Sequence, residues 1–235
     1  MIVFWDLDGT IRKNAELSYE AARVTLNKYF PDLRLKSNDA EEIYTYWNLA
    51  TFLAIRNNRN VFQEFLRMIT DKSDYDMNLL RLAADYAKSY VHQRIENLPP
   101  YEFTEHALQL TSDFRNGIIS HAKAGSTKIW LRNYGLDRYF DSNLIFDGVH
   151  EKADYMRGNF IYIGDSIADL YSFLLSLSRG NNGLLYMIRG YRYGKYRDEL
   201  IEEFDRTGNI SSRIVDVENA LEAAKRISNY ESLRL

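Results

Sequence analysis

The stretch Met1–Thr10, MIVFWDLDGT, ends an apolar run with two carboxylates, Asp6 and Asp8. The run Ile2–Trp5 is typical of a strand buried on both faces of a parallel sheet, and Gly9 then breaks the chain. Both acids therefore follow the carboxyl end of a predicted strand. In open α/β sheets ligands bind at that edge, because the loops from strands to helices converge there.

The composition limits the classes of protein that fit. The chain has 235 residues, 46% of them hydrophobic, which accommodates one large domain or a core domain with a smaller insert. No Cys is present, which excludes disulfides and thiolate zinc sites. The formal net charge of -3 gives no overall attraction to nucleic acid or anionic membranes. Since no apolar run reaches the roughly 18 residues of a membrane span, we expect a soluble cytoplasmic protein.

Further short apolar runs follow later in the chain, bounded by Gly, Asn, Asp or Ser and separated by helical or loop segments. This alternation predicts parallel strands joined by crossover helices. The runs begin near residues 117, 143, 159, 183 and 211, and the helical segment ENALEAAKRI follows the last one. We therefore predict an α/β fold with a doubly wound, Rossmann-like parallel sheet.

Residues 15–96 interrupt the alternation. Segments there place apolar residues at i, i+3 and i+4, and none has the pattern of a strand. Pro99 and Pro100 end the last helical segment. We predict an all-helical insert over residues 15–96, inside an α/β core domain over residues 1–14 and 97–235. The predicted helices are ELSYEAARVTLNKYF, DAEEIYTYWNLATFLAI, VFQEFLRMI and MNLLRLAADYAKSYVHQRI.

The acidic turn DLDGT has more than one interpretation. Asp side chains often only satisfy the amides of a turn, and a calcium loop fits poorly, because the further acids that it needs are absent. In IYIGDSIADL, however, Asp165 follows another predicted strand and Asp169 lies one helical turn later. With Asp6 and Asp8 they place four carboxylates at one edge of the sheet, where Mg²⁺ would relieve their repulsion. Helix capping is the alternative role for the later pair.

Two more polar residues follow predicted strands. Ser120 ends the strand in GIISH, where its hydroxyl and the following amides can hold an anion, although a serine at a helix start often only caps the helix. Lys152, in HEKADYM, follows the next apolar run, and a lone lysine is ordinarily a solvated surface charge. Their order along the chain makes both residues candidates for a site.

That order resembles the haloacid dehalogenase-like superfamily of phosphohydrolases: D-x-D-G-T after the first strand, a strand ending in Ser, a Lys, and G-D-S-x-x-D after another strand. The likeness covers about residues 1–14 and 100–235. It implies that Asp6 is a nucleophile that carries an aspartyl-phosphate, and that Asp8 is the general acid and base. Dehalogenase and phosphonatase members lack the second Asp, so Asp8 favours phosphate-ester chemistry.

The resemblance also implies a Mg²⁺ cofactor and groups that neutralise phosphoryl oxygens, since phosphoryl transfer needs positioning and charge stabilisation. The implied metal-binding residues are Asp6, Asp8 through its backbone carbonyl, Asp165, and Asp169 in support. The implied phosphate-binding residues are Ser120 and Lys152, with His121 as a candidate for contact with the leaving group or as a structural residue.

The segment between Lys152 and Asp165 is shorter than is usual in the superfamily, and Ala153 stands where a Pro often follows the lysine. If this shortening displaces Lys152, Arg157 is the substitute. The acidic residue that frequently follows the first motif is also missing, because IRKNAE stands there.

A helical insert between the first two motifs is a C1 cap in this superfamily, similar to that of phosphoglycolate phosphatase and β-phosphoglucomutase relatives. Closure of such a cap domain excludes water and selects the leaving group. Arg56 and Arg59, in IRNNRN, are candidates for contact with an anionic group of the substrate. The alternative is that they only favour a helix C-terminus.

The segment Arg189–Arg197, RGYRYGKYR, interleaves basic residues with Tyr directly after the run LLYMI. Such alternation can hold nucleic-acid strands, whereas a solvated loop with tyrosines on the core is the simpler interpretation. The segment keeps nucleotides and polynucleotide ends open as substrates.

The resemblance predicts Mg²⁺-dependent hydrolysis of a small phosphomonoester through an aspartyl-phosphate on Asp6. The alternatives are a phosphotransferase or mutase of the same fold, a nucleotide or polynucleotide-end phosphatase, and a non-catalytic phosphate-binding regulatory module. Asp8 argues against the regulatory module, because a built-in hydrolytic group does not serve a stable phospho-Asp. Substrate identity and oligomeric state stay open.

Overall fold

The computed structural model describes residues 1–57, 59–70, 76–205 and 209–232. Its contacts divide the chain into two compact units. We call them the sheet unit, Met1–Lys13 with Pro99–Leu235, and the helical unit, Asn14–Leu98.

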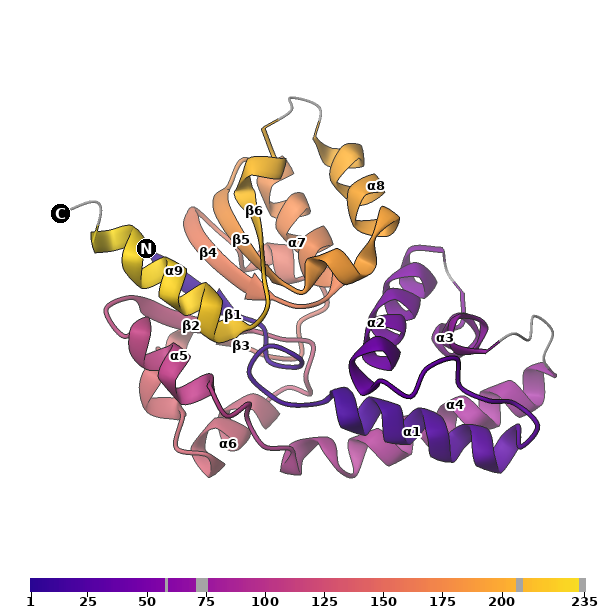
Figure 1. Cartoon of the computed structure of the whole chain (residues 1–235). Helices are drawn as coiled ribbons and strands as arrows, with labels where there is room; N and C mark the ends of the chain where they lie inside the picture. The colour runs from indigo at the N-terminus through magenta and orange to yellow at the C-terminus, as the bar shows by residue number, and fades with distance from the viewer. Residues whose placement is uncertain (58, 71–75, 206–208, 233–235) are drawn as a thin grey trace. The chain divides into compact units, whose positions relative to one another are not determined.

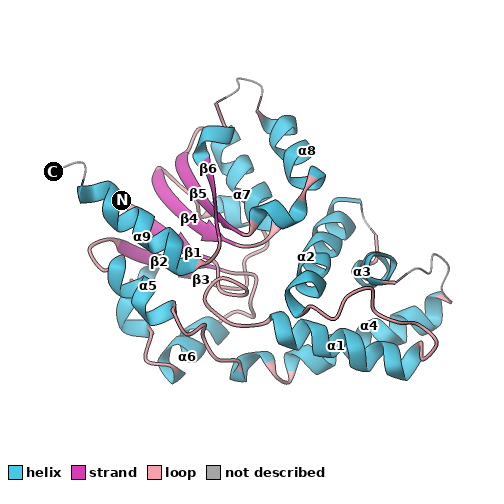
Figure 2. Ribbon diagram, viewed as in Figure 1, coloured by secondary structure: helices cyan, strands magenta, loops and turns pink. Residues whose placement is uncertain are grey.

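The sheet unit contains a parallel sheet of six strands in the order β3-β2-β1-β4-β5-β6. This order confirms the predicted doubly wound fold, because the chain builds outward from β1 in one direction and then returns past it to build in the other. Trp5 of β1 aligns with Ile118 of β2 on one side and with Ile163 of β4 on the other. The strands (Figure 2) are β1 (Ile2–Trp5), β2 (Arg115–Ile119), β3 (Ile145–Phe146), β4 (Asn159–Gly164), β5 (Asn182–Ile188) and β6 (Ile214–Val217).

Helices cover both faces of this sheet (Figure 1), which explains why β1 is apolar on both sides. On one face Val3, Trp5 and Ile163 pack in one core with residues of α5, α6 and α9. On the other face Phe173 of α7 packs edge-on against Phe160 of β4, and α8 lies beside α7. These helices are α5 (Thr104–Leu110), α6 (Ser126–Asn133), α7 (Ile167–Ser178), α8 (Lys195–Phe204) and α9 (Ala220–Ser232).

The helical unit has its own core and, in its described residues, no strand (Figure 2). Leu26, Ile43, Phe65 and Leu80, one from each helix, are buried together. The helices coincide with the four predicted helical segments: α1 (Ala15–Tyr29), α2 (Ala40–Asn57), α3 (Val61–Ile69) and α4 (Met77–His92). Among the described helices of the whole chain, none combines the length and apolar character needed to span a bilayer.

Candidate active site

Asp6 and Asp165 meet at the carboxyl edge of the sheet because β1 and β4 are neighbours. Asp6 directly follows β1, and its amide donates to the carbonyl of Ile163 on β4 at 2.8 Å. Asp165 directly follows β4. One carboxylate oxygen from each of Asp6, Asp165 and Asp169 lies within 4.8 Å of the other two, and all three residues are buried.

Lys152 lies inside this acidic cluster. Its Nζ is 2.6 Å from Oδ1 of Asp6, 2.6 Å from Oδ1 of Asp169 and 3.1 Å from the hydroxyl of Tyr162. Only 2% of the lysine is exposed. Arg157, the alternative to Lys152, is exposed, and its Nε donates to the carbonyl of Asp154 at 2.7 Å.

The short segment that carries Lys152 still places the lysine in the cluster, because neighbouring side chains hold the segment. The 3-10 turn Lys152–Asp154 takes the place of a crossover helix. Oε1 of Glu151 accepts hydrogen bonds from the amide of Ala153 and from the hydroxyl of Ser172 on α7, both at 3.0 Å. These bonds fix the turn against α7 and direct the lysine into the cluster.

Asp169 is both a helix cap and a member of the cluster. With Ser166 it forms a capping box at the start of α7. Its Oδ1 accepts from Lys152 and Tyr162, and its Oδ2 accepts from the amides of Asp165 and Ser166 and from the Ser166 hydroxyl. These donors fill the roughly four lone-pair positions of a carboxylate. Asp169 therefore orients its neighbours, and the donors occupy the positions that a metal ion would need.

Gly164 makes this packing feasible, because a Cβ there would lie 2.7 Å from Cγ of Asp169.

Asp165 is held by residues from two distant segments. The Thr10 hydroxyl donates to its Oδ1 at 3.1 Å, and the buried Tyr193 hydroxyl donates to its backbone carbonyl at 2.8 Å. Tyr193 belongs to the RGYRYGKYR segment, in which Tyr191 is 54% exposed. The expectation of a loop is therefore wrong in part: the segment forms a 3-10 turn over Gly190–Tyr193 and then the first turn of α8, with Tyr193 in the core and Tyr191 exposed.

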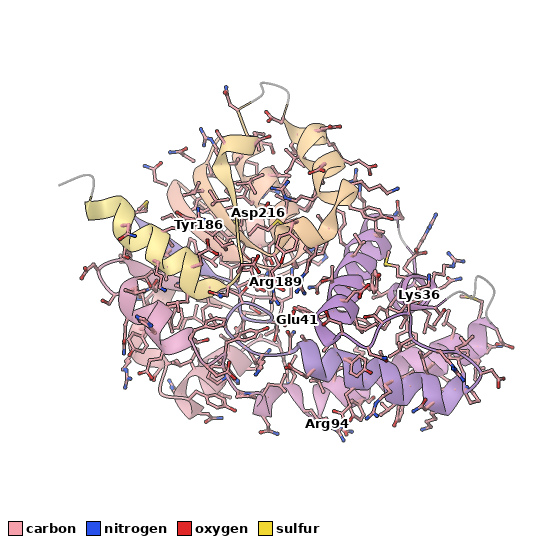
Figure 3. All side chains as sticks on the ribbon, in the orientation of Figure 1. Lys36, Glu41, Arg94, Tyr186, Arg189 and Asp216 are labelled. Atoms are coloured by element: carbon pink, nitrogen blue, oxygen red, sulfur yellow. The ribbon has the colours of Figure 1, made fainter. Side chains whose placement is uncertain are left out.

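Arg189, labelled in Figure 3, directly follows β5, and its amide donates to the carbonyl of Val217 on β6 at 2.7 Å. Its φ of 52° is the one positive value at a non-glycine residue in the described parts of the chain. This left-handed conformation costs about 1–2 kcal/mol. The positive charge of Arg189 partly offsets the effects that raise the pKa of Asp165.

We expected Asp8 to lie with the other three carboxylates, and this expectation is wrong: Asp8 is outside the cluster. Arg12 forms a bidentate ion pair with it, with Nε 2.7 Å from Oδ1 and Nη2 2.9 Å from Oδ2. The acidic edge therefore consists of a buried triad and a separate, partly exposed carboxylate. The role of the Asp8 backbone carbonyl as a metal ligand stays a prediction.

Ser120 and His121 follow β2 as predicted. Ser120 is buried, and its hydroxyl accepts from the amide of Ala122 at 3.0 Å. Nδ1 of His121 lies 2.8 Å from the carbonyl of Val149, which can only accept, so Nδ1 carries the proton. Burial and the charge of Lys152 lower the pKa of His121, which favours a neutral ring with Nε2 as an acceptor.

The charges of the cluster are unbalanced. Burial raises the pKa of Asp6 to about 7, although Lys152 opposes the rise. Burial and the other two carboxylates raise the pKa of Asp165 well above its usual range. Burial opposes the charged forms of Asp169 and Lys152 as well, but their mutual attraction and hydrogen bonds lower the pKa of Asp169 and raise that of Lys152. The cluster thus has one lysine for three buried carboxylates. A divalent cation would balance the negative charge that remains when all three are ionised.

Arg56 and Arg59 lie in the helical unit. Arg56 is in the last turn of α2, with its guanidinium 6.0 Å from the centre of the Phe52 ring. Nη1 of Arg59 pairs with Oε1 of Glu64 at 3.3 Å. Residue 58 of the IRNNRN stretch lies outside the described residues. The proposed contact of these arginines with substrate stays a prediction.

Four residues that contact the acids were not predicted from the sequence as members of the site. Thr10 and Arg12 stand within four residues of Asp8, so their proximity was a usable signal. Tyr162 precedes Asp165 by three residues on β4. Tyr193 lies in the RGYRYGKYR segment, but its contact with Asp165 bridges two strand ends and so could not be predicted from the segment itself.

Comparisons with known proteins agree with this fold. The model of the haloacid dehalogenase-like hydrolase family matches residues 3–172. No curated protein matches the sequence.

Several solved structures share the fold. A predicted phosphatase from Clostridium acetobutylicum is 21% identical, with a TM-score of 0.58 over 96% of this chain and 97% of that one. The hydrolase YfnB from Bacillus subtilis, bound to magnesium, is 16% identical, with a TM-score of 0.57 over 97% and 98%. A haloacid dehalogenase-like hydrolase from Streptococcus pneumoniae is 16% identical, with a TM-score of 0.59 over 96% and 97%.

Proposed function

Because the chain belongs to the haloacid dehalogenase-like hydrolase family, we propose that it hydrolyses a small phosphomonoester through an aspartyl-phosphate on Asp6. The observation that carries the proposal is the contact between Asp6 and Lys152, with Asp165 in the same buried cluster. A buried carboxylate beside a fixed ammonium group and a metal-binding acid has the surroundings that a nucleophile for a phosphate dianion needs.

Asp6 and Asp165 are the carboxylates proposed to hold Mg²⁺, with the Asp8 carbonyl as a third ligand. Few protein carboxylates are typical of Mg²⁺ sites, because the ion keeps several waters. When bound, the ion supplies positive charge that favours ionised Asp6 and stabilises the phosphoryl oxygens. The magnesium bound in YfnB supports this choice of ion.

In the first step a carboxylate oxygen of Asp6 attacks the phosphorus. The bond from phosphorus to the ester oxygen breaks, its electron pair stays on that oxygen, and Asp8 supplies the proton that the leaving alcohol needs. Lys152 and Ser120 are proposed to bind the phosphoryl oxygens, so that Lys152 keeps Asp6 and the phosphate close despite their like charges.

In the second step a water oxygen attacks the phosphorus of the aspartyl-phosphate. Asp8 accepts a proton from that water, the bond from phosphorus to the Asp6 oxygen breaks, and Asp6 returns as a carboxylate. Ester and water thus give alcohol and inorganic phosphate. The neutral His121 ring is proposed to accept a hydrogen bond from the leaving group through Nε2.

We propose that the helical unit acts as a cap that selects the leaving group, with Arg56 and Arg59 as candidates for contact with a second anionic group of the substrate. This role follows from the place of the insert between the motifs that carry Asp6 and Ser120.

Turnover of p-nitrophenyl phosphate with and without Mg²⁺ tests the proposed function. We expect turnover only with the metal, and loss of at least about 10³-fold in Asp6→Asn, because no other group replaces the nucleophile. Asp113→Asn is the matched control, since Asp113 is exposed and outside the site, and it should keep full activity. Unchanged turnover in Asp6→Asn would place the nucleophile elsewhere.

A screen of phosphoglycolate, sugar phosphates, nucleotides and 3'-phosphorylated oligonucleotides then identifies the substrate class. We expect the highest kcat/KM with one of the small phosphomonoesters. A clear preference for oligonucleotide ends would instead favour a substrate role for the RGYRYGKYR segment.

A further inference from the structure

The Arg12 side chain is almost fully buried, and its guanidinium forms a bidentate ion pair with the carboxylate of Asp8. Arg12 is 1% exposed, and two of its nitrogens contact both oxygens of Asp8 at 2.7 and 2.9 Å. A bidentate pair of this kind fixes the plane of the carboxylate as well as its position. A buried arginine is costly unless such a partner is present.

The backbone between the two residues is closed on itself. Gly9, with a φ of 79°, turns the chain, and its amide donates to the carbonyl of Arg12 at 2.9 Å. The amide of Arg12 donates back to the carbonyl of Leu7 at 2.8 Å. The loop therefore brings the arginine, four residues on, alongside Asp8.

The sheet unit anchors this loop from outside. The centre of the Trp130 ring lies 5.7 Å from Cζ of Arg12, within the range of a cation-π contact. The carbonyl of Ile11 accepts from the amide of Tyr101 at 3.0 Å and from the hydroxyl of Thr104 at 3.1 Å. The position of the guanidinium is thus set by the fold rather than by Asp8 alone.

We propose that Arg12 is a positioning residue that fixes the orientation of the general acid and base, Asp8; the inference rests on the proposed function. Asp8 has to protonate the leaving oxygen first and accept a proton from the attacking water second. A carboxyl group that is already held in one orientation loses no further conformational entropy before each proton transfer. The same ion pair keeps the Asp8 carboxylate apart from the three clustered acids.

Lysine cannot form this bidentate pair, because it presents a single ammonium charge on a flexible side chain instead of a planar guanidinium. Arg12→Lys therefore keeps the charge and loses the orientation. A purely structural role for Arg12 predicts something different, namely a loss of stability with equal losses in every step.

The test separates the two steps with p-nitrophenyl phosphate, whose leaving group needs little protonation. Rapid mixing measures the burst of p-nitrophenolate, which reports phosphorylation of Asp6, and the following steady rate, which reports hydrolysis. In Arg12→Lys we expect a burst rate within about 3-fold of wild type and hydrolysis slowed about 10-fold or more, which is the size of effect that misplacing a catalytic group produces. KM should change little.

A double-mutant cycle with Asp8→Asn gives the decisive readout. If Arg12 acts through Asp8, Arg12→Lys causes no further slowing of hydrolysis in the Asp8→Asn background. The same fold loss in both backgrounds would overturn the proposal, and so would wild-type kinetics in Arg12→Lys. Lys13→Met is the control for the loss of a neighbouring charge, since Lys13 pairs with Glu102 at 2.9 Å, and it should leave both steps unchanged.

If Arg12→Lys does not fold, Arg12→Gln takes its place in the cycle, because it keeps a donor without the fork. Failure of this inference differs from failure of the proposed function. An additive cycle in a protein that forms phospho-Asp6 rejects only the role of Arg12, whereas wild-type protein without turnover rejects the proposed function.

Discussion

Lys152 and Asp6 are 146 residues apart in the chain, yet Nζ of the lysine lies 2.6 Å from Oδ1 of the aspartate in a buried site. The contact joins the segment after β3 to the end of β1. A pair of opposite charges out of water is maintained only where the fold holds both partners, so the fold fixes this contact.

Replacing Lys152 with Met leaves Asp6 and Asp169 buried without their counter-charge. We expect a loss of about 3–5 kcal/mol in the free energy of unfolding at neutral pH, the usual cost of breaking a buried pair on one side. Urea unfolding measures it. Arg179→Met is the matched control, because Arg179 and Asp154 form an exposed pair at 2.8 Å. That change should cost less than about 1 kcal/mol. Equal losses in the two variants would contradict the account.

The pH dependence of stability follows from Asp6. Its pKa in the folded protein, about 7, is above the ordinary value of 3.8, so between these values the folded state binds more protons than the unfolded state. The contribution of Asp6 therefore makes metal-free protein less stable as pH rises from about 4 to 7. Thermal unfolding in EDTA should show this decline, and Asp6→Asn should flatten it. A decline of the same slope in Asp6→Asn would refute this assignment.

Mg²⁺ has to displace the protons of Asp6 and Asp165 in order to bind. The rise in Tm caused by Mg²⁺ should consequently be larger at pH 8 than at pH 5. Na⁺ at matched ionic strength separates ligation from screening. A rise in Tm that is equal at both pH values, or equal with Na⁺, would argue against a site made of these carboxylates.

Gly164→Ala places a methyl group where Cγ of Asp169 lies only 2.7 Å away. We expect a cost of about 1–3 kcal/mol from overpacking, together with a fall in turnover, because Asp169 holds Lys152. Gly180→Ala is the control: its φ of 85° makes alanine strained, but a Cβ there meets no atom within 4 Å. It should lose about 1–2 kcal/mol and keep turnover. Full activity in Gly164→Ala would mean that the position of Asp169 does not matter.

Tyr162→Phe removes the hydroxyl that donates to Asp169 at 2.5 Å and lies 3.1 Å from Lys152. Asp169 keeps its other donors, so the expected loss of stability is only about 1 kcal/mol. Turnover should fall with little change in KM. Tyr155→Phe, at a partly exposed tyrosine, is the control for loss of a hydroxyl. An effect no larger than that of the control would remove Tyr162 from the site.

The sequence was sufficient to predict the sheet and the edge at which Asp6 and Asp165 lie, because both depend on local patterns. Short apolar runs such as Ile2–Trp5 indicate buried parallel strands, and residues directly after them, such as Asp6 and Asp165, must lie at one edge. The four helices of the helical unit were equally readable from their periodicity.

The pairing of side chains was less predictable. Asp8 follows its strand in the way that many loop acids do, and the local sequence does not show that its carboxylate pairs with Arg12. Likewise, the capping role and the cluster role of Asp169 looked like alternatives, whereas its two oxygens serve both. Such choices depend on directions of side chains in three dimensions, which periodicity does not encode.

The central claim, that Asp6 is the group that becomes phosphorylated, is tested most directly by rapid acid quench of the wild-type protein during turnover of p-nitrophenyl phosphate with Mg²⁺, followed by peptide mass spectrometry. The account predicts a phosphate on Asp6 in the peptide that contains MIVFWDLDGT, and none in Asp6→Asn. A phosphate on another residue of a protein that turns over would contradict it.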